Sequence, residues 1–178
     1  IHSYHSKYIP QMAGYLIEFL SKEGDLILDN FSGSGTTLIE AKLKNRNAIG
    51  VDINPLACLI SKAKTTPLNE IKLKKDVYNL IEDINQDITS IRTQKSLSNF
   101  GKEIKKDLPK NIIPDFPYIG GWFQQQVIKE LSIIKYHINK LEDKDIRDFC
   151  LMCFSSIIRP VSNAASEFGN LMINKKRE

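Results

Sequence analysis

The sequence predicts an α/β fold, with a small parallel sheet in the first third of the chain and a helical part after it. Three observations predict this. Residues 1–68 alternate helical and strand patterns, and a glycine-rich turn follows the first strand. A strand, a helix and a second strand in close succession favour a parallel sheet with a right-handed crossover. After residue 68, apolar residues recur at helical spacing over long stretches, which indicates helices.

Each element of the first third has its own signal. The opening helix repeats apolar residues every three or four positions and stops at Gly24. A short apolar run then predicts a strand buried on both faces. Thr36 and Thr37 can cap the next helix, and Asn54 before Pro55 is typical of a helix start. The predicted elements are helix 9–22, strand 25–30, turn 31–35, helix 36–44, strand 48–53 and helix 55–64.

The remainder is predicted to be a helical insertion over residues 69–161, followed by a tail over 162–178. Asp143 or Asp145 can cap its last helix, which ends before Pro160. A polar, proline-punctuated loop carries lysines at 102, 105, 106 and 110; a solvated loop is favoured there over a phosphate-binding patch. The predicted elements are helix 72–93, loop 96–117, helix 123–141 and a helix from 143 or 145 to 158.

Composition sets only broad limits. The net charge of +4 and the pI of about 8.9 permit an anionic partner without requiring one. Cys150 and Cys153 form a C-x-x-C pair within an apolar helical run, so buried free thiols are favoured over a zinc site. No apolar stretch is long enough to span a bilayer, and no signal peptide is visible. A cytoplasmic, reducing location is therefore expected, with no membrane partner.

The segment L-D-N-F-S-G-S-G-T-T, residues 28–37, carries the strongest functional signal. A glycine-rich turn between a parallel strand and a helix lets backbone approach a ligand closely, and the helix start favours an anionic group. A nucleoside triphosphate site would need a lysine after Gly35, and a dinucleotide site would need glycine at Leu38. S-adenosylmethionine fits better, because its carboxylate can meet Thr36 and Thr37, its ammonium group Asp29, and its ribose Asp52.

Two further segments accompany this turn: H-S-Y-H-S-K-Y-I-P-Q-M, residues 2–12, and G-V-D-I-N-P, residues 50–55. The three segments, in this order and spacing, resemble the cofactor-binding part of S-adenosylmethionine-dependent DNA amino-methyltransferases. These enzymes methylate the exocyclic amino group of adenine or cytosine. The resemblance covers residues 2–67 and implies a Rossmann-like methyltransferase fold with a partial parallel sheet. The cofactor contacts it implies are His5, Lys7, Tyr8, Asp29, Phe31, Ser32, Gly33, Ser34, Gly35, Thr36, Thr37, Asp52, Ile53 and Asn54.

The family's catalytic motif, [DNS]-P-P-[YFW], is not found. The nearest string, D-F-P-Y at residues 115–118, has Phe116 where the motif needs proline and lacks a preceding strand. By resemblance, the motif is expected on a strand beyond Glu178, and residues 1–178 alone are expected to be inactive. Trp122 and Phe123 are expected to be packing anchors of the insertion.

The expected function is therefore that of a site-specific DNA methyltransferase, of which residues 1–68 bind the methyl donor. The family implies double-stranded DNA with the target base flipped out, a restriction subunit as a further partner, and no metal. Three alternatives stay open: an RNA amino-methyltransferase, a non-catalytic subunit that binds S-adenosylmethionine, and a nicotinamide-dependent dehydrogenase.

Overall fold

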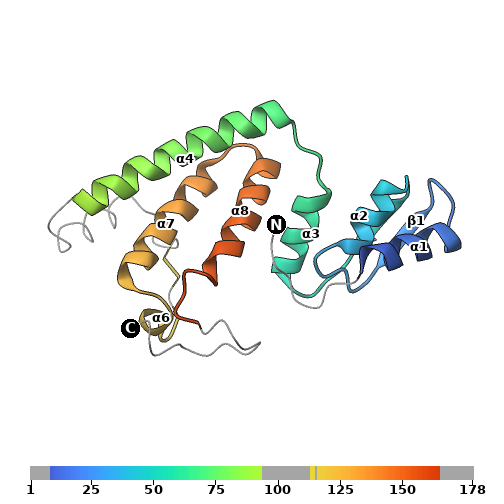
Figure 1. The fold of residues 1–178 in the computed structure, drawn as a ribbon, viewed down its shortest axis with the longest axis horizontal. Helices are drawn as coiled ribbons and strands as arrows, with labels where there is room; N and C mark the ends of the chain where they lie inside the picture. The colour runs from blue at the N-terminus through green and yellow to red at the C-terminus, as the bar shows by residue number, and fades with distance from the viewer. Residues whose placement is uncertain (1–8, 94–112, 115, 165–178) are drawn as a thin grey trace. The chain divides into compact units, whose positions relative to one another are not determined.

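The computed structural model describes residues 9–93, 113–114 and 116–164 of the chain (Figure 1). Over these residues the protein is a mixed α/β molecule, mostly helical, with a two-stranded parallel sheet. It divides into two compact units, residues 1–68 with 144–153, and residues 69–143 with 154–178. Some predictions fall outside the described residues: those on His5, Lys7, Tyr8, the lysines at 102, 105, 106 and 110, Asp115, residues 165–178 and most of the loop 96–117.

The predicted helices and strands are present, with their ends shifted by a few residues. None of the described helices combines the length and the apolar character needed to cross a membrane. A single helical turn, α6, is added within the region between the predicted helices. The elements are α1 (Pro10–Leu20), β1 (Leu26–Asp29), α2 (Thr36–Leu43), β2 (Asn47–Gly50), α3 (Pro55–Thr65), α4 (Glu70–Thr93), α6 (Ile119–Trp122), α7 (Gln125–Lys140) and α8 (Lys144–Ile158).

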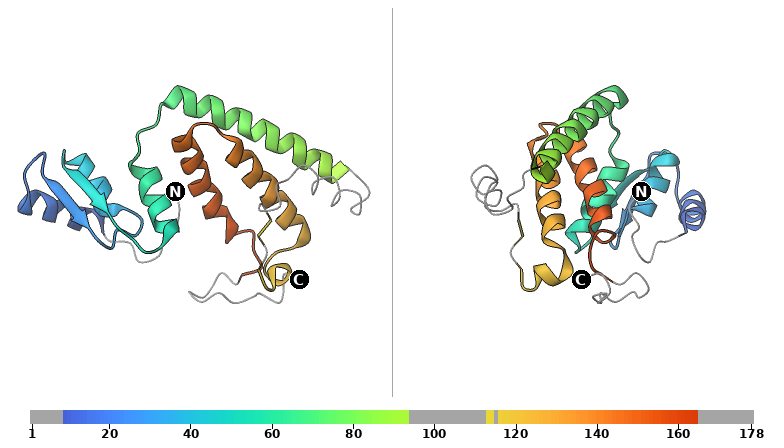
Figure 2. Two further views of the ribbon diagram at one scale, coloured as in Figure 1. Left: turned by 180° about the vertical axis from the view of Figure 1, so that it is seen from behind. Right: turned by 60° about the vertical axis from the view of Figure 1, so that its left-hand side comes forward.

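In the first unit, β1 and β2 lie side by side and parallel, which confirms the predicted pairing (Figure 2). The register pairs Leu26 with Asn47 and Asp29 with Gly50. Helix α2 connects the strands and packs on the sheet, and α1 packs against α2. The carboxyl ends of both strands therefore lie at one edge of the sheet, where the glycine-rich turn begins.

The prediction that the first strand is buried is wrong for the described structure. Leu26 is 62% exposed and Leu28 is 67% exposed. Side chains alternate between the two faces of a strand, so these leucines share a face with Ile49, which is exposed too. The covering helix α2 lies over the other face, where Ile27 and Ala48 are half-buried. A short apolar run does not reveal how many of its faces are covered.

Helix α3 begins as predicted, with proline in its first turn. The amide oxygen of Asn54 accepts a hydrogen bond from the Leu56 N–H at 3.0 Å and so caps the helix. Ile60 and Ala63 pack against Met152 and Phe149, which belong to the part of α8 in this unit. This cluster forms a small apolar core beneath α3.

The cysteine prediction is only half right. All three cysteines are free, and Cys150 is buried, but Cys153 is exposed. Cys150 and Cys153 are three residues apart on α8, and partial desolvation raises the pKa of the exposed Cys153 thiol above its ordinary value. The apolar helical pattern alone did not show that Cys150 is buried while Cys153 is exposed.

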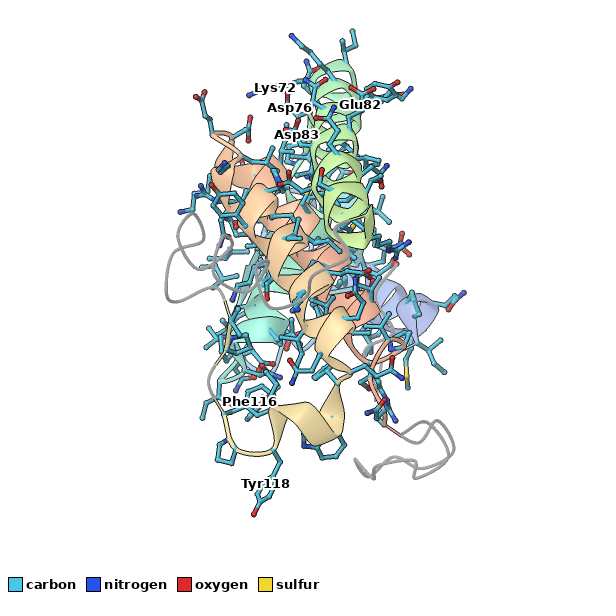
Figure 3. All side chains as sticks on the ribbon, turned by 90° about the vertical axis from the view of Figure 1, so that its left-hand side faces the viewer. Lys72, Asp76, Glu82, Asp83, Phe116 and Tyr118 are labelled. Carbon is cyan, nitrogen blue, oxygen red and sulfur yellow. The ribbon has the colours of Figure 1, made fainter. Side chains whose placement is uncertain are left out.

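The second unit is built on α4 and α7, which lie along each other. Polar side-chain pairs join the two helices near the surface: Arg92 with Glu130 at 2.9 Å, and His137 with Asp87 at 2.8 Å. Figure 3 shows Lys72, Asp76, Glu82 and Asp83 projecting from α4. Lys72 is paired with Asp143, just before α8.

The aromatic segment, residues 118–123, precedes α7 and is held by residues that follow α8. The Asn163 side-chain amide donates to the Gly121 carbonyl at 3.1 Å, and its backbone N–H donates to the Trp122 carbonyl at 2.8 Å. Asn163 is buried, whereas Tyr118 points away from the helices with its ring exposed (Figure 3). Trp122 and Phe123 are half-buried at this turn.

Candidate functional site

The turn between β1 and α2 depends on its glycines. Gly33 has a φ of 49° and Gly35 a φ of 80°, a left-handed region that residues with a side chain rarely adopt. The Gly35 N–H donates to the Ser32 carbonyl at 2.8 Å, which closes the turn. The Ser32 N–H donates to the Val51 carbonyl at 3.0 Å and ties the turn to the chain after β2. The turn is thus a fixed structure, with Ser32 and Ser34 buried.

Asp52 joins this turn to the second strand. Its Oδ2 accepts a hydrogen bond from the Gly33 N–H at 2.8 Å, and its Oδ1 accepts one from the Asn54 N–H at 2.8 Å. The structure therefore brings together the two segments that the sequence separates by 19 residues. Each carboxylate oxygen has two acceptor positions, so both retain capacity for a ligand hydroxyl.

An open cavity of about 500 Å³ lies between the turn and α1. This volume is within the range of about 300–1,000 Å³ found for small-molecule sites. One wall consists of predicted site residues, namely Asp29, Phe31, Ser32, Gly33, Ser34, Thr36 and Thr37. The other wall was missed as a site from the sequence: Ala13, Leu16, Ile17, Leu20, Ser21, Ile27 and Leu28.

Among the described residues, four predicted ones do not line this cavity: Gly35, Asp52, Ile53 and Asn54. Gly35, the last residue of the turn, faces Ser61 of α3, and Asp52 is connected to the cavity wall through Gly33. The Asn54 side chain is occupied at the start of α3, and the Ile53 side chain is fully exposed.

The start of α2 is open to an anionic group. The expectation that Thr36 or Thr37 caps this helix is wrong, because Gly35 occupies the N-cap position and no side chain there makes a capping hydrogen bond. Thr36 and Thr37 instead form the first helical turn, whose N–H groups have no acceptor within the helix. These N–H groups, together with the helix dipole, suit a carboxylate.

Asp29 and Phe31 shape the cavity rim. Asp29 Oδ1 accepts a hydrogen bond from the Phe31 N–H at 3.1 Å, so this carboxylate stabilises the turn as well as lining the cavity. The Phe31 ring is 84% exposed. The site thus has a negative group at Asp29, an apolar surface at Phe31 and an electropositive helix N-terminus at α2.

Helix α3 supports the turn from behind, a role that the sequence did not indicate. A Cβ atom on Gly35 would lie 2.7 Å from Ser61 Cβ, so only glycine allows this close approach. Lys64 donates from Nζ to the Ser34 carbonyl at 3.0 Å. In the part of the chain that the structure describes, no three His, Cys, Asp or Glu side chains are grouped to hold a metal ion.

Comparison with known proteins identifies similar chains. Residues 3–63 match the family model described as DNA methylase. The type II methyltransferase M.MvaI of Kocuria varians is 37% identical over 91% of this chain, and the match covers 34% of that protein. The type II methyltransferase M.MjaII of Methanocaldococcus jannaschii is 27% identical over 90% of this chain, covering 39% of that protein.

A shorter match is more similar still. The type II methyltransferase M.HindIII of Haemophilus influenzae is 51% identical over 22% of this chain, covering 13% of that protein. The chain thus spans little more than a third of the length of M.MvaI and M.MjaII. No solved structure matches it significantly.

Proposed function

We propose that this chain forms the methyl-donor-binding part of an S-adenosylmethionine-dependent DNA amino-methyltransferase, because residues 3–63 match the DNA methylase family model and M.MvaI is 37% identical over most of the chain. The observation that carries the proposal is the hydrogen bond between the Gly33 N–H and Asp52, which joins a glycine-rich turn to an acid one strand away. The residues fit the donor chemically. When bound, the donor supplies an electrophilic methyl group on a sulfonium sulfur.

Each end of the donor has a proposed partner. The first-turn N–H groups at Thr36 and Thr37 bind the carboxylate, and Asp29 binds the ammonium group. Asp52 accepts hydrogen bonds from the ribose hydroxyls, using the lone pairs that its two backbone bonds leave. Phe31 supplies apolar contact at the rim.

The other cofactor contacts remain predictions of the same proposal. The backbone of the turn passes through Ser32, Gly33, Ser34 and Gly35, while Ile53 and Asn54 follow Asp52. We retain His5, Lys7 and Tyr8 as contacts to the methionine end. The proposal divides the chain into residues 1–68 for the donor, 69–161 as a helical insertion, and 162–178 as a connection, within a Rossmann-like methyltransferase fold.

The proposed reaction is transfer of the methyl group to an exocyclic amino nitrogen of adenine or cytosine in double-stranded DNA, with the base flipped out. The matching family model is described as DNA methylase, which favours DNA over RNA. The catalytic [DNS]-P-P-[YFW] motif must come from outside residues 1–178. A cytoplasmic location and a restriction subunit as partner belong to the same proposal.

Calorimetric titration tests the proposal. We expect the chain to bind S-adenosylmethionine, and S-adenosylhomocysteine to compete for the same site. NAD should not bind, since Leu38 occupies the position where the dinucleotide fingerprint needs glycine. Tight binding of NAD with no binding of S-adenosylmethionine would reverse the assignment and favour a dehydrogenase.

A further inference from the structure

We infer that Lys64, on α3, is a positioning residue for the methyl donor. Its ammonium group holds the glycine-rich turn in the shape that presents the start of α2 to the donor's carboxylate. This inference rests on the proposed function, because it assigns a role at the same site. It adds a residue that lies outside the three sequence segments on which the family resemblance depends.

The hydrogen bond made by Lys64 fixes one peptide unit. Lys64 Nζ donates to the Ser34 carbonyl at 3.0 Å in a partly buried position. The N–H of the same peptide unit belongs to Gly35 and donates to the Ser32 carbonyl at 2.8 Å. Both polar ends of the Ser34–Gly35 peptide are therefore bonded, so its plane cannot rotate without breaking a hydrogen bond.

This peptide plane sets the direction in which α2 begins. It is followed directly by Gly35, whose φ of 80° and ψ of 29° place it in the left-handed region at the N-cap. The N–H groups proposed to bind the carboxylate come next, at Thr36 and Thr37. Rotating the peptide plane changes the φ of Gly35 and turns those N–H groups away from the cavity. Lys64 thus acts on the ligand through the turn, without touching it.

The same face of α3 makes a second contact with the turn. Ser61 is three residues before Lys64, which places the two side chains on one side of the helix. Ser61 is buried against Gly35, where an added Cβ would also lie 2.9 Å from Ser61 Cα. Ser61 limits the approach of the turn to α3, and Lys64 fixes the orientation of its peptide.

Lys62 provides a matched control on the same helix. It is directed toward α8, where its Nζ lies 2.6 Å from Asp148 Oδ2, and not toward the turn. A Lys→Met change at either position removes one ammonium group from α3 while keeping a side chain of similar length and good helix propensity. The two variants therefore differ in whether the lost ammonium group holds the turn.

The experiment measures the binding of two ligands to the full chain by calorimetry. S-adenosylmethionine carries the amino-acid end, and 5′-methylthioadenosine lacks it. We expect Lys64→Met to raise the Kd for S-adenosylmethionine about tenfold, the effect of losing one charge-assisted hydrogen bond. The Kd for 5′-methylthioadenosine should change by less than about twofold. Lys64→Arg should restore most of the affinity, and Lys62→Met should leave both Kd values unchanged.

A selective loss of affinity for S-adenosylmethionine supports the inference, since a general loosening of the protein would weaken the binding of both ligands. Equal weakening of both ligands, or no weakening of either, overturns it. Lys64→Gln gives a second measurement of the same loss if Lys64→Met is shown by circular dichroism to be unfolded. If the wild-type chain binds no S-adenosylmethionine, the proposed function fails and this inference fails with it, so the wild-type titration distinguishes the two failures.

Discussion

The glycine-rich turn of the first unit and the α4–α7 pair of the second use polar groups in opposite ways. In the turn, the backbone groups of the buried Ser32 bond to other backbone groups, and the half-buried Asp52 carboxylate accepts a hydrogen bond from a backbone N–H. Between α4 and α7, charged side chains at the surface pair with each other, as Arg92 does with Glu130. The first arrangement fixes the backbone in one shape, whereas the second adds weak attraction to helices that already pack together.

The difference indicates where a substitution should matter. Backbone held by buried hydrogen bonds cannot relax when one partner is lost, because the remaining partner is left unpaired away from water. When one partner of an exposed ion pair is lost, water hydrates the remaining charged group, so the cost in free energy is small. We therefore expect changes in the turn to affect ligand binding strongly, and changes on the α4–α7 surface to affect only stability, and weakly.

The largest effect should come from Gly35→Ala. The substitution places a Cβ in the left-handed region, which costs about 1–2 kcal/mol, and drives it against Ser61, where overpacking adds about 1–3 kcal/mol. We expect the free energy of unfolding to fall by about 3 kcal/mol and the binding of S-adenosylmethionine to be lost. Denaturant unfolding and calorimetry measure the two effects.

Gly24 is the matched control for that change. Its φ of 85° is similar, but an added Cβ would have no atom within 4 Å. In Gly24→Ala the free energy of unfolding should therefore fall only by the cost of the left-handed conformation, about 1 kcal/mol, and the affinity for S-adenosylmethionine should be unchanged. If both variants lost the same free energy of unfolding and both kept their affinity for S-adenosylmethionine, the close packing of Gly35 on Ser61 would not contribute to ligand binding.

The second effect concerns Asp52→Asn. The amide keeps one acceptor oxygen but directs an NH₂ group at a backbone N–H, so the variant loses one of the two bonds that Asp52 makes to Gly33 and Asn54. We expect the Kd for S-adenosylmethionine to rise at least about tenfold, because the ribose contact and the turn are both weakened. Asp25→Asn is the control, since Asp25 accepts a similar bond from the Lys22 N–H in an exposed turn. Unchanged affinity in Asp52→Asn would place the ribose elsewhere.

The third effect concerns a buried polar anchor in the second unit. Asn163 is such an anchor, and Asn163→Ala removes its side-chain bond to the Gly121 carbonyl while the backbone bond to Trp122 remains. We expect the free energy of unfolding to fall by about 1–2 kcal/mol, because the partly buried Gly121 carbonyl loses this hydrogen bond. Asn139→Ala, on the exposed side of α7, should change it by less than about 0.5 kcal/mol. Equal values for the two variants would mean that the aromatic segment does not depend on Asn163.

The sequence predicted the elements well because their signals are local. The apolar spacing of 72–93 and 123–141, and the Asn54-Pro55 start of α3, each act within a few residues. The partnership of the turn with Asp52 was also predictable, since parallel strands end at the same edge of a sheet.

What the sequence did not predict depends on segments far apart in the chain. The exposure of Leu26 and Leu28 depends on which faces of the sheet are covered. The contact of Lys64 with Ser34 joins residues 30 positions apart, and no local pattern marks it. Part of the apolar face of α1 lines the cavity, which the sequence did not predict, because a helical spacing shows which face is apolar but not what that face meets.

The smallest effect should come from Lys72→Met, which removes the ion pair with Asp143. The hydrogen bond to Asp143 raises the pKa of Lys72 above its ordinary value of 10.5, despite some opposing desolvation. A pKa raised on folding means that the charged form stabilises the folded state, so the contribution is complete below pH 10.5 and is lost as the pH rises through the higher folded-state value. At pH 8 we expect the variant to melt about 1 °C lower than wild type, and the difference to vanish in about 1 M salt, because the pair is exposed. Circular dichroism melting at pH 8 and above pH 11 measures this. A difference that persisted in high salt and above pH 11 would show that the Lys72 side chain contributes through packing, and the contrast between the two regions would then need a different physical basis.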